Sequence, residues 1–577
     1  MFPSAVERMR YFKTIAFLLV SLWMIVLMYI SFGGLHSPRA TAEYDAIVRH
    51  IDALHKRVLE GSQNLKKTIE RLNLPQHAES LAPTGSAGHS HEVLRNRAIN
   101  FAREIFFAVT GSLKEINQSL ADNSQAGRKA VIASLESLRE RIDEMTQYLE
   151  IDLDGLGRVD HLAENRRREL DRLGELVQKR LQKLQNPTDC SKARLLLVSL
   201  TRPCAFGCNV HHLAYCLQLA YASGRTLILT SILTGYGEWW SRNFLPLSST
   251  CSEEAADSSS DTFFEKETTN SPRIVECPYI AHLSHLNWLP PAVPADLAPN
   301  LTRLHAAPSV WFIGQLITYL MRPAPQFARI LNDTLTSFGL VSPRGTPIAG
   351  LHVRRTDKVN TEAAFHSVKE YMFYVERRFR FWDAQQQMMN RHAEWINDAQ
   401  PHYTSTTPRQ VFIATDDPSV LDEARKQYPN YVFLGDSKRA ESASVGSRGS
   451  SDSITGVALD IMVLSKADYI VCTFSSQVCR ISYELMQVRH GDLGDASGLA
   501  QSLDDTYYYG GQQQVSPEVI IKDEASGLEP GKHIHVAGNH WNGFARVVDL
   551  PGQSNVMVPA YKYRPRVLAV PMGNFDD

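Results

Sequence analysis

The hydrophobic pattern of the chain begins with an uninterrupted apolar run. Residues 14–32 contain no charged residue and are rich in Leu, Ile, Val, Phe and Met. About 20 such residues suffice to span a bilayer. Arg8, Arg10 and Lys13 precede the run, and no matching basic cluster follows it closely. The positive-inside rule therefore predicts a cytoplasmic tail at residues 1–13, a membrane anchor at residues 14–32 and a lumenal remainder, with a cleaved signal peptide as the alternative.

Residues 33–185 carry a different pattern, in which apolar positions are separated alternately by three and four residues. The clearest example is Leu135, Leu138, Ile142, Met145 and Leu149. This spacing places the apolar side chains on one stripe of a helix, as in coiled coils. We predict a helical coiled-coil stem over this range, through which the chain forms a homodimer. An intramolecular helical hairpin is the alternative.

Short strand-like runs alternate with helical patterns from residue 186 to residue 510. The runs are rich in Val, Ile and Leu and include "ARLLLVSL", "RTLILTSI", "PIAGLHVRR", "RQVFIATDD", "NYVFLGD" and "ADYIVCTFSS". Strands that are buried on both faces have this composition, and their alternation with helices indicates a parallel sheet. We predict an α/β domain of the Rossmann type, whose ligands bind beyond the carboxyl ends of the strands.

Residues 511–577 contain short strand-like runs with frequent turns. The segment "LEPGKHIHV", Trp541 and "VPAY" resemble an SH3-like β-barrel, but "VIIKDEA" stands where such barrels usually have an aromatic stretch. The sequence therefore indicates only half of a proline-peptide groove. We expect a module that packs on the preceding domain rather than a receptor for proline-rich peptides.

Overall charge and cysteine content narrow the classes of function. The formal net charge is −2, so no whole-protein field attracts nucleic acid, and no nucleic-acid partner is expected. The eight cysteines lie beyond residue 189, and an even number of cysteines in an oxidising compartment indicates disulfides. Cys204 and Cys208 resemble half of a zinc site, but the adjacent His211 and His212 do not suit a tetrahedral cage. We predict no metal site.

Charged residues follow the predicted strand that ends near Val353. Arg354 and Arg355 present planar donors suited to phosphate oxygens; an internal ion-pair network with Asp357 is the alternative. A helix begins near Ser476, where free N–H groups could face an anion. No Gly-rich phosphate loop follows the strands, which argues against a nucleotide hydrolase. No Asp-x-Asp pair follows them either, which argues against a divalent ion that would hold a diphosphate ligand.

Several longer segments resemble the eukaryotic α1,6-fucosyltransferases that add core fucose to N-glycans. They are "GLHVRRTDKVNTEAAFH", "VFIATDDPSV", "CTFSSQVCRISYELMQ", "SLDDTYYYGGQ" and "VAGNHWNGF". The resemblance implies a Golgi single-pass type II membrane protein with a lumenal GT-B-like catalytic domain. It also implies transfer of L-fucose from GDP-β-L-fucose to O6 of the innermost Asn-linked GlcNAc, with inversion and without a cofactor or divalent metal. The expected acceptors are N-glycoproteins with GlcNAc-terminated complex-type glycans.

The resemblance also implies roles for individual residues. Glu362 matches the catalytic base, with Lys358 beside it, and Arg354 and Arg355 match the residues that handle the diphosphate. The other implied donor contacts are His352, Asp460, Ser476, Gln477 and Tyr236. The implied acceptor contacts are Asp357, Asp416, Asp417, Asp504, Asp505, His540 and Trp541. The implied disulfides are Cys190–Cys251, Cys204–Cys208 and Cys472–Cys479; Val198 stands where the family has the usual partner of Cys216, so pairing of Cys216 with Cys277 stays open.

Three other functions are compatible with parts of the sequence. Another Golgi fucosyltransferase that uses a GDP-sugar would share the arginine-rich donor site, but it would not explain the stem and the C-terminal module. A catalytically inactive glycan-binding scaffold would not need Glu362, Lys358 and the arginine pair. A Golgi adaptor that acts through the stem and the C-terminal module is weakened by the missing aromatic stretch.

Overall fold

The structure is a computed structural model of the 577-residue chain. It describes residues 95, 99–100, 102–107, 109–111, 125–159, 161–200, 205–230, 235–252, 261–262, 271–278, 288, 291–340, 346–359, 361, 363–391, 408–444, 446–447, 449–489, 494–509, 517–539, 541–548 and 556–573. Residues 14–32, Cys204, Glu362 and His540, all singled out from the sequence, lie outside these ranges.

A first parallel sheet has the strand order β2-β1-β4-β3. Its strands are β1 (Leu195–Ser199), β2 (Thr226–Thr230), β3 (Asp261–Thr262) and β4 (Ile274–Glu276). Helix α6 (Phe206–Ser223) connects β1 to β2 and is buried along nearly its whole length. It ends at Gly224, whose φ of 65° is the left-handed conformation that glycine adopts readily at a helix end. The short helix α7 (Gly235–Asn243) follows β2.

A second parallel sheet has the order β10-β9-β6-β7-β8. Its strands are β6 (Ile348–Val353), β7 (Arg409–Thr415), β8 (Tyr431–Leu434), β9 (Tyr469–Cys472) and β10 (Ala500–Ser502). Because side chains alternate along a strand, β6 and β7 feed two separate cores. Ile348 and Phe412 enter one, and Leu351 and Ile413 enter the other. This double burial explains the nearly continuous apolar runs in the sequence.

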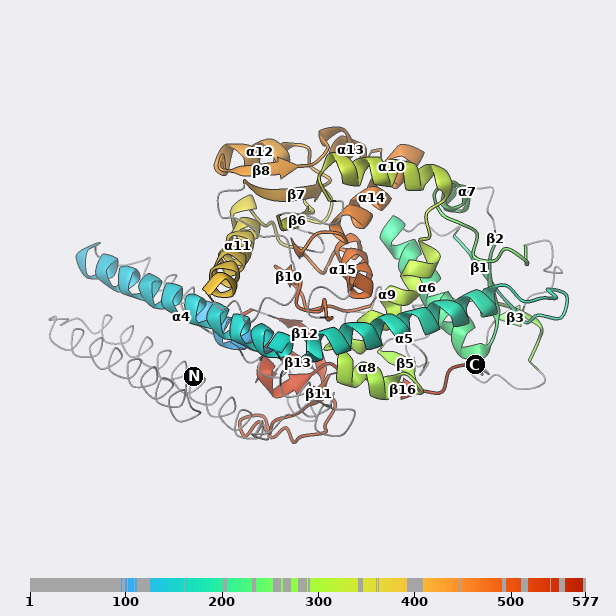
Figure 1. Ribbon diagram of the computed structural model, residues 1–577, viewed down its shortest axis with the longest axis horizontal. Coiled ribbons are helices and arrows are strands. Elements are labelled where there is room, and N and C mark those ends of the chain that lie inside the picture. The colour runs from blue at the N-terminus through green and yellow to red at the C-terminus, as the bar shows by residue number, and fades with distance from the viewer. Residues whose placement is uncertain are drawn as a thin grey trace.

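Helices pack between and around the two sheets (Figure 1). They are α8 (Ala298–Leu304), α9 (Pro308–Leu320), α10 (Pro325–Ser337), α11 (Val368–Arg391), α12 (Ser419–Gln427), α13 (Ser437–Ser442), α14 (Ser451–Leu464) and α15 (Gln477–Arg489). One large core joins α6 and α9 of the first half to α14 and α15 of the second. Gly314 allows α9 to cross α15 closely, since a Cβ there would overlap the backbone of Glu484. These observations confirm the α/β fold that the sequence predicted for residues 186–510. We call this part of the chain the catalytic body, after the activity that the resemblance implies.

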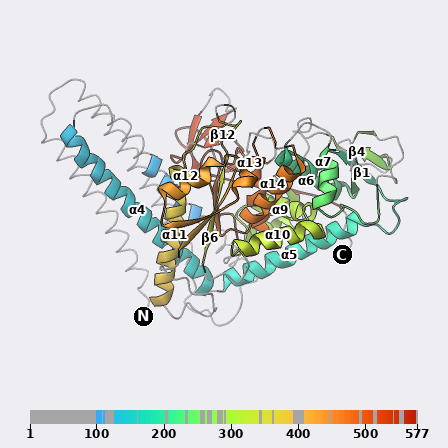
Figure 2. The same cartoon turned by 90° about the horizontal axis from the view of Figure 1, so that it is seen from above.

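The predicted stem contains two long helices that meet at an angle (Figure 2). They are α4 (Gln125–Val159) and α5 (Leu162–Gln185). On α4, Ile142 packs with Val109 of the same chain. On α5, Leu170 and Val177 are fully buried in the large core of the catalytic body. The heptad-like stripes at these positions therefore meet partners within the chain, as in the intramolecular alternative, because an apolar stripe does not itself specify its partner.

The C-terminal part forms short antiparallel strands with a core of their own. They are β11 (Glu518–Val519), β12 (His535–Asn539), β13 (Phe544–Val548), β14 (Val556–Pro559) and β15 (Tyr563–Arg564), with a 3-10 turn at η4 (Ala560–Lys562). Val519, Leu528 and Val547 are among the residues that fill the core. The chain then returns to the catalytic body, where β16 (Leu568–Val570) pairs with β5 (Ala292–Pro294).

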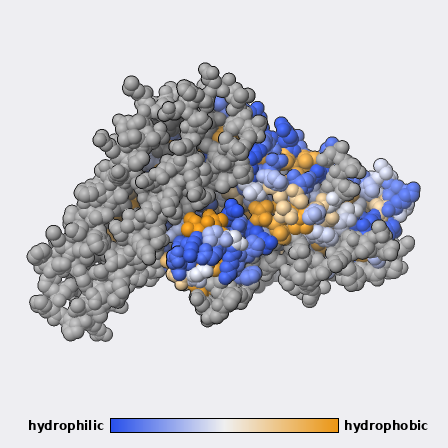
Figure 3. Space-filling view, turned by 90° about the horizontal axis from the view of Figure 1, so that it is seen from below, coloured by the Kyte–Doolittle hydropathy of each residue, from blue (hydrophilic) through white to orange (hydrophobic). Residues whose placement is uncertain are grey.

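The expectation of a membrane anchor has to be corrected. Within the described ranges, no helix is both long and apolar enough to cross a bilayer. The long helices α4 and α5 carry charged residues throughout, and in the view from below the described surface shows only small hydrophobic patches bordered by hydrophilic residues (Figure 3). This finding contradicts the predicted single-pass type II Golgi membrane protein, and we do not retain that prediction. The apolar run at residues 14–32 lies outside the residues searched.

Two of the described disulfides join positions 61 residues apart, and a third spans seven residues. Cys190 pairs with Cys251 and Cys472 with Cys479, the pairs that the resemblance implies. Cys216 pairs with Cys277, which decides a question that the sequence left open. Cys208 is also disulfide-bonded, but its expected partner Cys204 lies outside the described residues.

Candidate active site

The carboxyl ends of neighbouring strands in the second sheet bring charged residues together. Because β6 and β7 are parallel and adjacent, the residues that follow them lie at the same edge. Arg354 donates to the carboxylate of Asp416 through Nη1 and to Asp357 Oδ1 through Nη2 at 2.7 Å. The backbone N–H of Arg355 donates to Asp416 Oδ1 at 2.9 Å. Asp416, only 4% exposed, therefore ties the segment after β6 to the end of β7.

The side chain of Arg355 is held by acids that follow β7. Its Nη1 donates to Glu423 Oε2 at 2.7 Å and lies 3.5 Å from Asp417 Oδ2. Its Nε and Nη2 are buried and meet no hydrogen-bond partner among the described residues. The ring of Phe365, which is 54% exposed, lies over the guanidinium at 4.9 Å. Arg355 thus has one satisfied edge and one that lacks an acceptor.

Lys358 and Asp504 connect the segments that follow β6, β9 and β10. Lys358 Nζ donates to the backbone oxygen of Ser475 at 2.9 Å. Asp504 Oδ1 accepts from Ser475 N at 3.3 Å and from Ser502 Oγ at 2.9 Å. The indole N–H of Trp541 donates to the backbone oxygen of Asp504 at 2.8 Å. The C-terminal strands therefore contact the same edge of the sheet as the charged segments.

His352 is buried on β6 directly beside the arginine pair. Burial lowers the pKa of His352 to about 4, and the positive charges of Arg354 and Lys358 act in the same direction. The imidazole is therefore neutral at neutral pH. Its Nδ1 meets no partner among the described residues, so a ligand could supply one.

Two of the acids expected in the site have pKa values that are shifted in opposite directions. Burial would raise the pKa of Asp417, but hydrogen bonds from Ser419 and the charge of Arg355 bring it below its ordinary value. Burial raises the pKa of Asp460 to about 7, although Arg439, whose Nε lies 3.4 Å from Asp460 Oδ1, opposes the shift. Asp460 is on α14, a separate element from the arginine pair. A carboxylate with such a pKa can lose its proton when a donor group binds to it.

The segment after β9 leads into the first turn of α15. Ser476 is buried, and its backbone N–H donates to Thr473 O at 3.0 Å. Gln477, the first residue of α15, places its Oε1 2.8 Å from His211 Nδ1 on α6. The start of a helix of this length offers backbone N–H groups and a positive dipole end to an anion.

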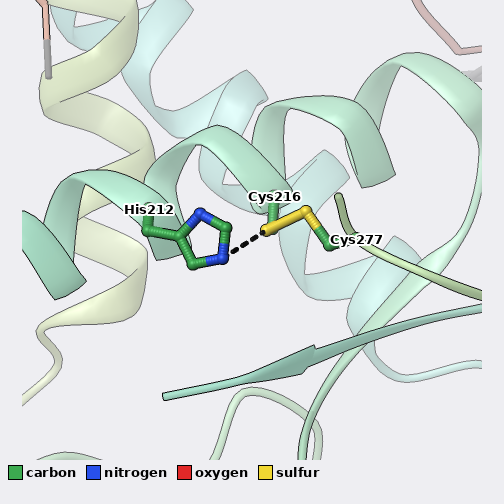
Figure 4. A group of neighbouring side chains, drawn as sticks. All are labelled: His212, Cys216 and Cys277. Atoms are coloured by element: carbon green, nitrogen blue, oxygen red, sulfur yellow. Dashed lines mark hydrogen bonds between the residues drawn. A yellow bond between two sulfur atoms is a disulfide. The ribbon is translucent and has the colours of Figure 1, made fainter. Parts of the chain in front are cut away.

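A group of possible metal ligands lies elsewhere, on α6 and beyond β4. His212, Cys216 and Cys277 have ligand atoms within 4.8 Å of one another. Figure 4 shows that the two sulfur atoms are bonded to each other, with the His212 ring beside them. Disulfide sulfurs lack the thiolate that binds metals, so this group does not form a metal centre in this state.

Comparison with known proteins identifies the family. The family model described as alpha-(1,6)-fucosyltransferase N- and catalytic domains matches residues 49–508. An alpha-(1,6)-fucosyltransferase of Drosophila melanogaster is 39% identical over 456 residues, which cover 76% of this chain and 69% of that protein. The chain belongs to the alpha-(1,6)-fucosyltransferase family. The Caenorhabditis elegans member is 32% identical over 522 residues, covering 88% of this chain and 85% of that protein.

Solved structures with some similarity include other fucosyltransferases. A crystal structure of NodZ alpha-1,6-fucosyltransferase soaked with GDP-fucose aligns at 15% sequence identity and a TM-score of 0.26, covering 51% of this chain and 93% of that one. POFUT1 in complex with GDP aligns at 13% identity and a TM-score of 0.26, covering 54% of this chain and 98% of that one.

Family membership makes this chain a fucosyltransferase, and the expected site residues can be placed on it. The described ones at the edge of the second sheet are His352, Arg354, Arg355, Asp357, Lys358, Asp416, Asp417, Ser476, Gln477, Asp504 and Asp505. Asp505 follows Asp504 and donates its backbone N–H to Asp504 Oδ1. Tyr236 lies in α7, but its side chain lies outside the described part, as do Glu362 and His540.

The candidate site also contains residues that the sequence did not single out for it. Glu423 on α12 holds Arg355, and His211 and Glu484 meet near Gln477. Glu484 lies within the segment "CTFSSQVCRISYELMQ" that carries the resemblance, although no role was assigned to it, whereas His211 and Glu423 lie in none of the segments quoted for the resemblance. The adjacent histidines His211 and His212 were noticed only as poor zinc ligands. Their separation from the other site residues in the sequence hides the contacts that they make.

Proposed function

We propose that this fucosyltransferase moves L-fucose from GDP-β-L-fucose to O6 of the innermost Asn-linked GlcNAc of N-glycoproteins, with inversion at the anomeric carbon. An inverting displacement needs a base near the acceptor hydroxyl and stabilisation of the departing diphosphate. The catalytic body would then be GT-B-like, with two Rossmann-type halves that flank the donor.

The observation that carries the donor site is the unsatisfied edge of Arg355. Nε and Nη2 are buried without a hydrogen-bond partner among the described residues, and a buried donor left unpaired costs about 1–3 kcal/mol. Two nitrogens on one side of a guanidinium match two phosphate oxygens. A phosphate reaches these buried nitrogens only after neighbouring side chains move. The ring of Phe365 lies over the guanidinium and is exposed, so it can move aside and open a path to these nitrogens.

The remaining roles follow the family motif. Glu362 would act as the base on the acceptor hydroxyl, with Lys358 beside it. Arg354, held by Asp416 and Asp357, would share the diphosphate charge with Arg355, so that no divalent ion is needed there. His352, Ser476, Gln477, Asp460 and Tyr236 would complete the donor site, with the Asp460 carboxylate accepting hydrogen bonds from guanine.

The acceptor side would be built from the other acids and from the C-terminal strands. Asp357, Asp416, Asp417, Asp504, Asp505, His540 and Trp541 are the proposed contacts to a GlcNAc-terminated complex-type glycan. The hydrogen bond from Trp541 to Asp504 supports this arrangement, because it joins the C-terminal strands to the segment that follows β10. A homodimer through the helical stem is also proposed. Met145 and Tyr148 on α4 are exposed and available for such a contact.

The test is transfer to a defined acceptor. The full chain is incubated with GDP-fucose and a GlcNAc-terminated biantennary N-glycopeptide, with and without EDTA, and the mass and linkage of the product are read. We expect one added fucose on the innermost GlcNAc in both conditions. Arg355→Ala and Glu362→Gln should nearly abolish transfer, whereas Arg425→Ala, which removes an exposed arginine of α12, should not. A well-folded Glu362→Gln enzyme with normal turnover would remove Glu362 from the role of base.

A further inference from the structure

A buried chain of side chains connects α6 of the first half to the start of α15 in the second. The two ring nitrogens of His211 meet different partners on α15. Nδ1 lies 2.8 Å from Gln477 Oε1, and Nε2 lies 3.0 Å from Glu484 Oε2. His211 and Gln477 are 266 positions apart in the sequence. The His211 ring thus spans the junction between the two halves of the catalytic body.

The partners of His211 hold its ring in one orientation. Glu484 is completely buried, and its Oε1 accepts the hydroxyl of Tyr507 at 2.6 Å. The hydroxyl of Tyr509 donates to the backbone oxygen of His211 at 2.6 Å. Because a carboxylate only accepts hydrogen bonds, Glu484 favours a hydrogen on Nε2 of His211. A neutral ring with its hydrogen on Nε2 accepts at Nδ1 and pairs with the NH2 group of the Gln477 amide, whereas a ring with hydrogens on both nitrogens donates from Nδ1 to Gln477 Oε1, the atom that lies 2.8 Å away. The hydrogens on the ring beside Glu484 therefore decide which end of the Gln477 amide faces His211.

The backbone of α6 is shaped for this approach. A Cβ added at Gly207 would lie 2.7 Å from Gln477 Cβ, closer than real side chains allow. Glycine at this position lets the start of α15 pack directly on α6. His211 lies one helical turn further along α6 and reaches the Gln477 amide from there. Two positions of α6 thus determine where the Gln477 side chain lies.

We propose that His211 is a positioning residue for the transfer reaction: it fixes which edge of the Gln477 amide is turned toward the donor diphosphate. Glu484 and Tyr507 hold the His211 ring, and His211 holds the amide. This inference rests on the proposed function, in which Gln477 contacts the donor. It adds a requirement that the two halves of the body be correctly joined before Gln477 can meet the diphosphate.

Two carboxamide variants separate a positioning role from a merely structural one. The amide nitrogen of Asn lies near the place of imidazole Nδ1, and that of Gln lies near the place of Nε2. His211→Asn therefore keeps a group facing Gln477, whereas His211→Gln keeps one facing Glu484. We expect the dissociation constant of GDP, measured by calorimetry on the full chain, to rise about tenfold in His211→Ala and His211→Gln. It should stay within about threefold of the unaltered protein in His211→Asn.

Steady-state kinetics and a double variant complete the test. The KM for GDP-fucose should rise in His211→Gln while the KM for the glycopeptide does not. His211→Ala combined with Gln477→Ala should bind GDP no more weakly than Gln477→Ala alone, because the first change acts through the second residue. His212→Asn, at the adjacent buried histidine beside the Cys216 disulfide, is the control for disturbing α6 and should leave GDP binding unchanged. Thermal melts verify folding of each variant.

The outcomes distinguish this inference from the proposed function. If the unaltered chain binds no GDP and transfers no fucose, the proposed function fails. If the unaltered chain binds GDP but His211→Asn and His211→Gln are equally weakened, the positioning role is wrong. Losses that multiply in the double variant would also refute it. If His211→Ala does not fold, the Asn and Gln variants, which keep a polar group in the cavity, decide the question.

Discussion

Asp416 and Asp357 both bind Arg354, but they differ in burial, and this difference can be tested. Asp416 is 4% exposed and also accepts from Arg355 N and Thr356 Oγ1. Asp357 is 44% exposed. Asp416→Asn replaces one accepting oxygen with an N–H group that faces other donors. Asp357→Asn removes a charge that water already screens. We therefore expect Asp416→Asn to be much the more damaging of the two variants.

The magnitudes follow from burial. Removing one partner of a fully buried ion pair costs about 3–5 kcal/mol. Arg354 keeps some access to water and its contact with Asp357, so we expect about 2–3 kcal/mol for Asp416→Asn. An exposed pair contributes about 0–1 kcal/mol, which is the expectation for Asp357→Asn. At an unfolding entropy of about 2.1 cal/mol/K per residue, a body of roughly 300 residues loses about 1.6 °C per kcal/mol, so Asp416→Asn should lower the melting midpoint by about 3–5 °C.

Activity measurements then separate two roles for Asp416. If Asp416 positions the arginine pair, Asp416→Asn should mainly raise the KM for GDP-fucose, with kcat/KM about 30–100-fold lower. If Asp416 contacts the glycan, as the family motif implies, the KM for the glycopeptide should rise instead. Equal shifts of the melting midpoint in the Asp416 and Asp357 variants would refute the burial argument.

Further predictions concern ionisation and a disulfide. The folded pKa of His352 is about 4, below the ordinary value of about 6.5, so the unfolded chain takes up a proton first as pH drops, and the protein should lose stability between about pH 6.5 and pH 4. The melting midpoint of His352→Asn should decline less over that range than that of the unaltered chain. Parallel curves would contradict the shift. The pKa of Asp460 is about 7, and a guanine contact needs the carboxylate, so the affinity for GDP should increase as pH rises through 7. The affinity of Asp460→Asn for GDP should not change with pH in this range. If it changes as in the unaltered chain, Asp460 does not bind guanine. The Cys216–Cys277 disulfide joins positions 61 residues apart, so loop entropy predicts that Cys277→Ser lowers the free energy of unfolding by roughly 4 kcal/mol. A melting midpoint equal to that of the unaltered chain would show that the bond does not stabilise the fold.

The second sheet and its charged edge could be predicted from short segments. Runs such as "PIAGLHVRR" and "RQVFIATDD" indicate buried parallel strands by composition alone. Arg354 and Asp416 each follow one of these runs, and ligands of parallel sheets bind beyond the carboxyl ends of the strands. The structure adds that Asp416 holds Arg354 directly. A residue expected to contact the acceptor is thus also engaged in holding the arginine pair.

Contacts between distant segments were beyond such reasoning. The stripe of α5 that includes Leu170 and Val177 has the spacing of a coiled coil, yet it packs into the catalytic body. Periodicity reports which face of a helix is apolar, and any apolar surface of suitable shape can cover it. The pairing of Cys216 with Cys277 could not be chosen from spacing either, because cysteines that pair need only be close in space.

The amino-acid sequence by itself determined the local elements, the chemical character of the strand ends and membership of the family. These properties depend on side-chain type and on spacings of a few residues. Only the tertiary structure decided that Glu423 holds Arg355 and that His211 holds Gln477 across 266 positions. Hydrogen bonds act over about 3 Å, and the packing of whole helices and sheets is what brings such residues within that distance.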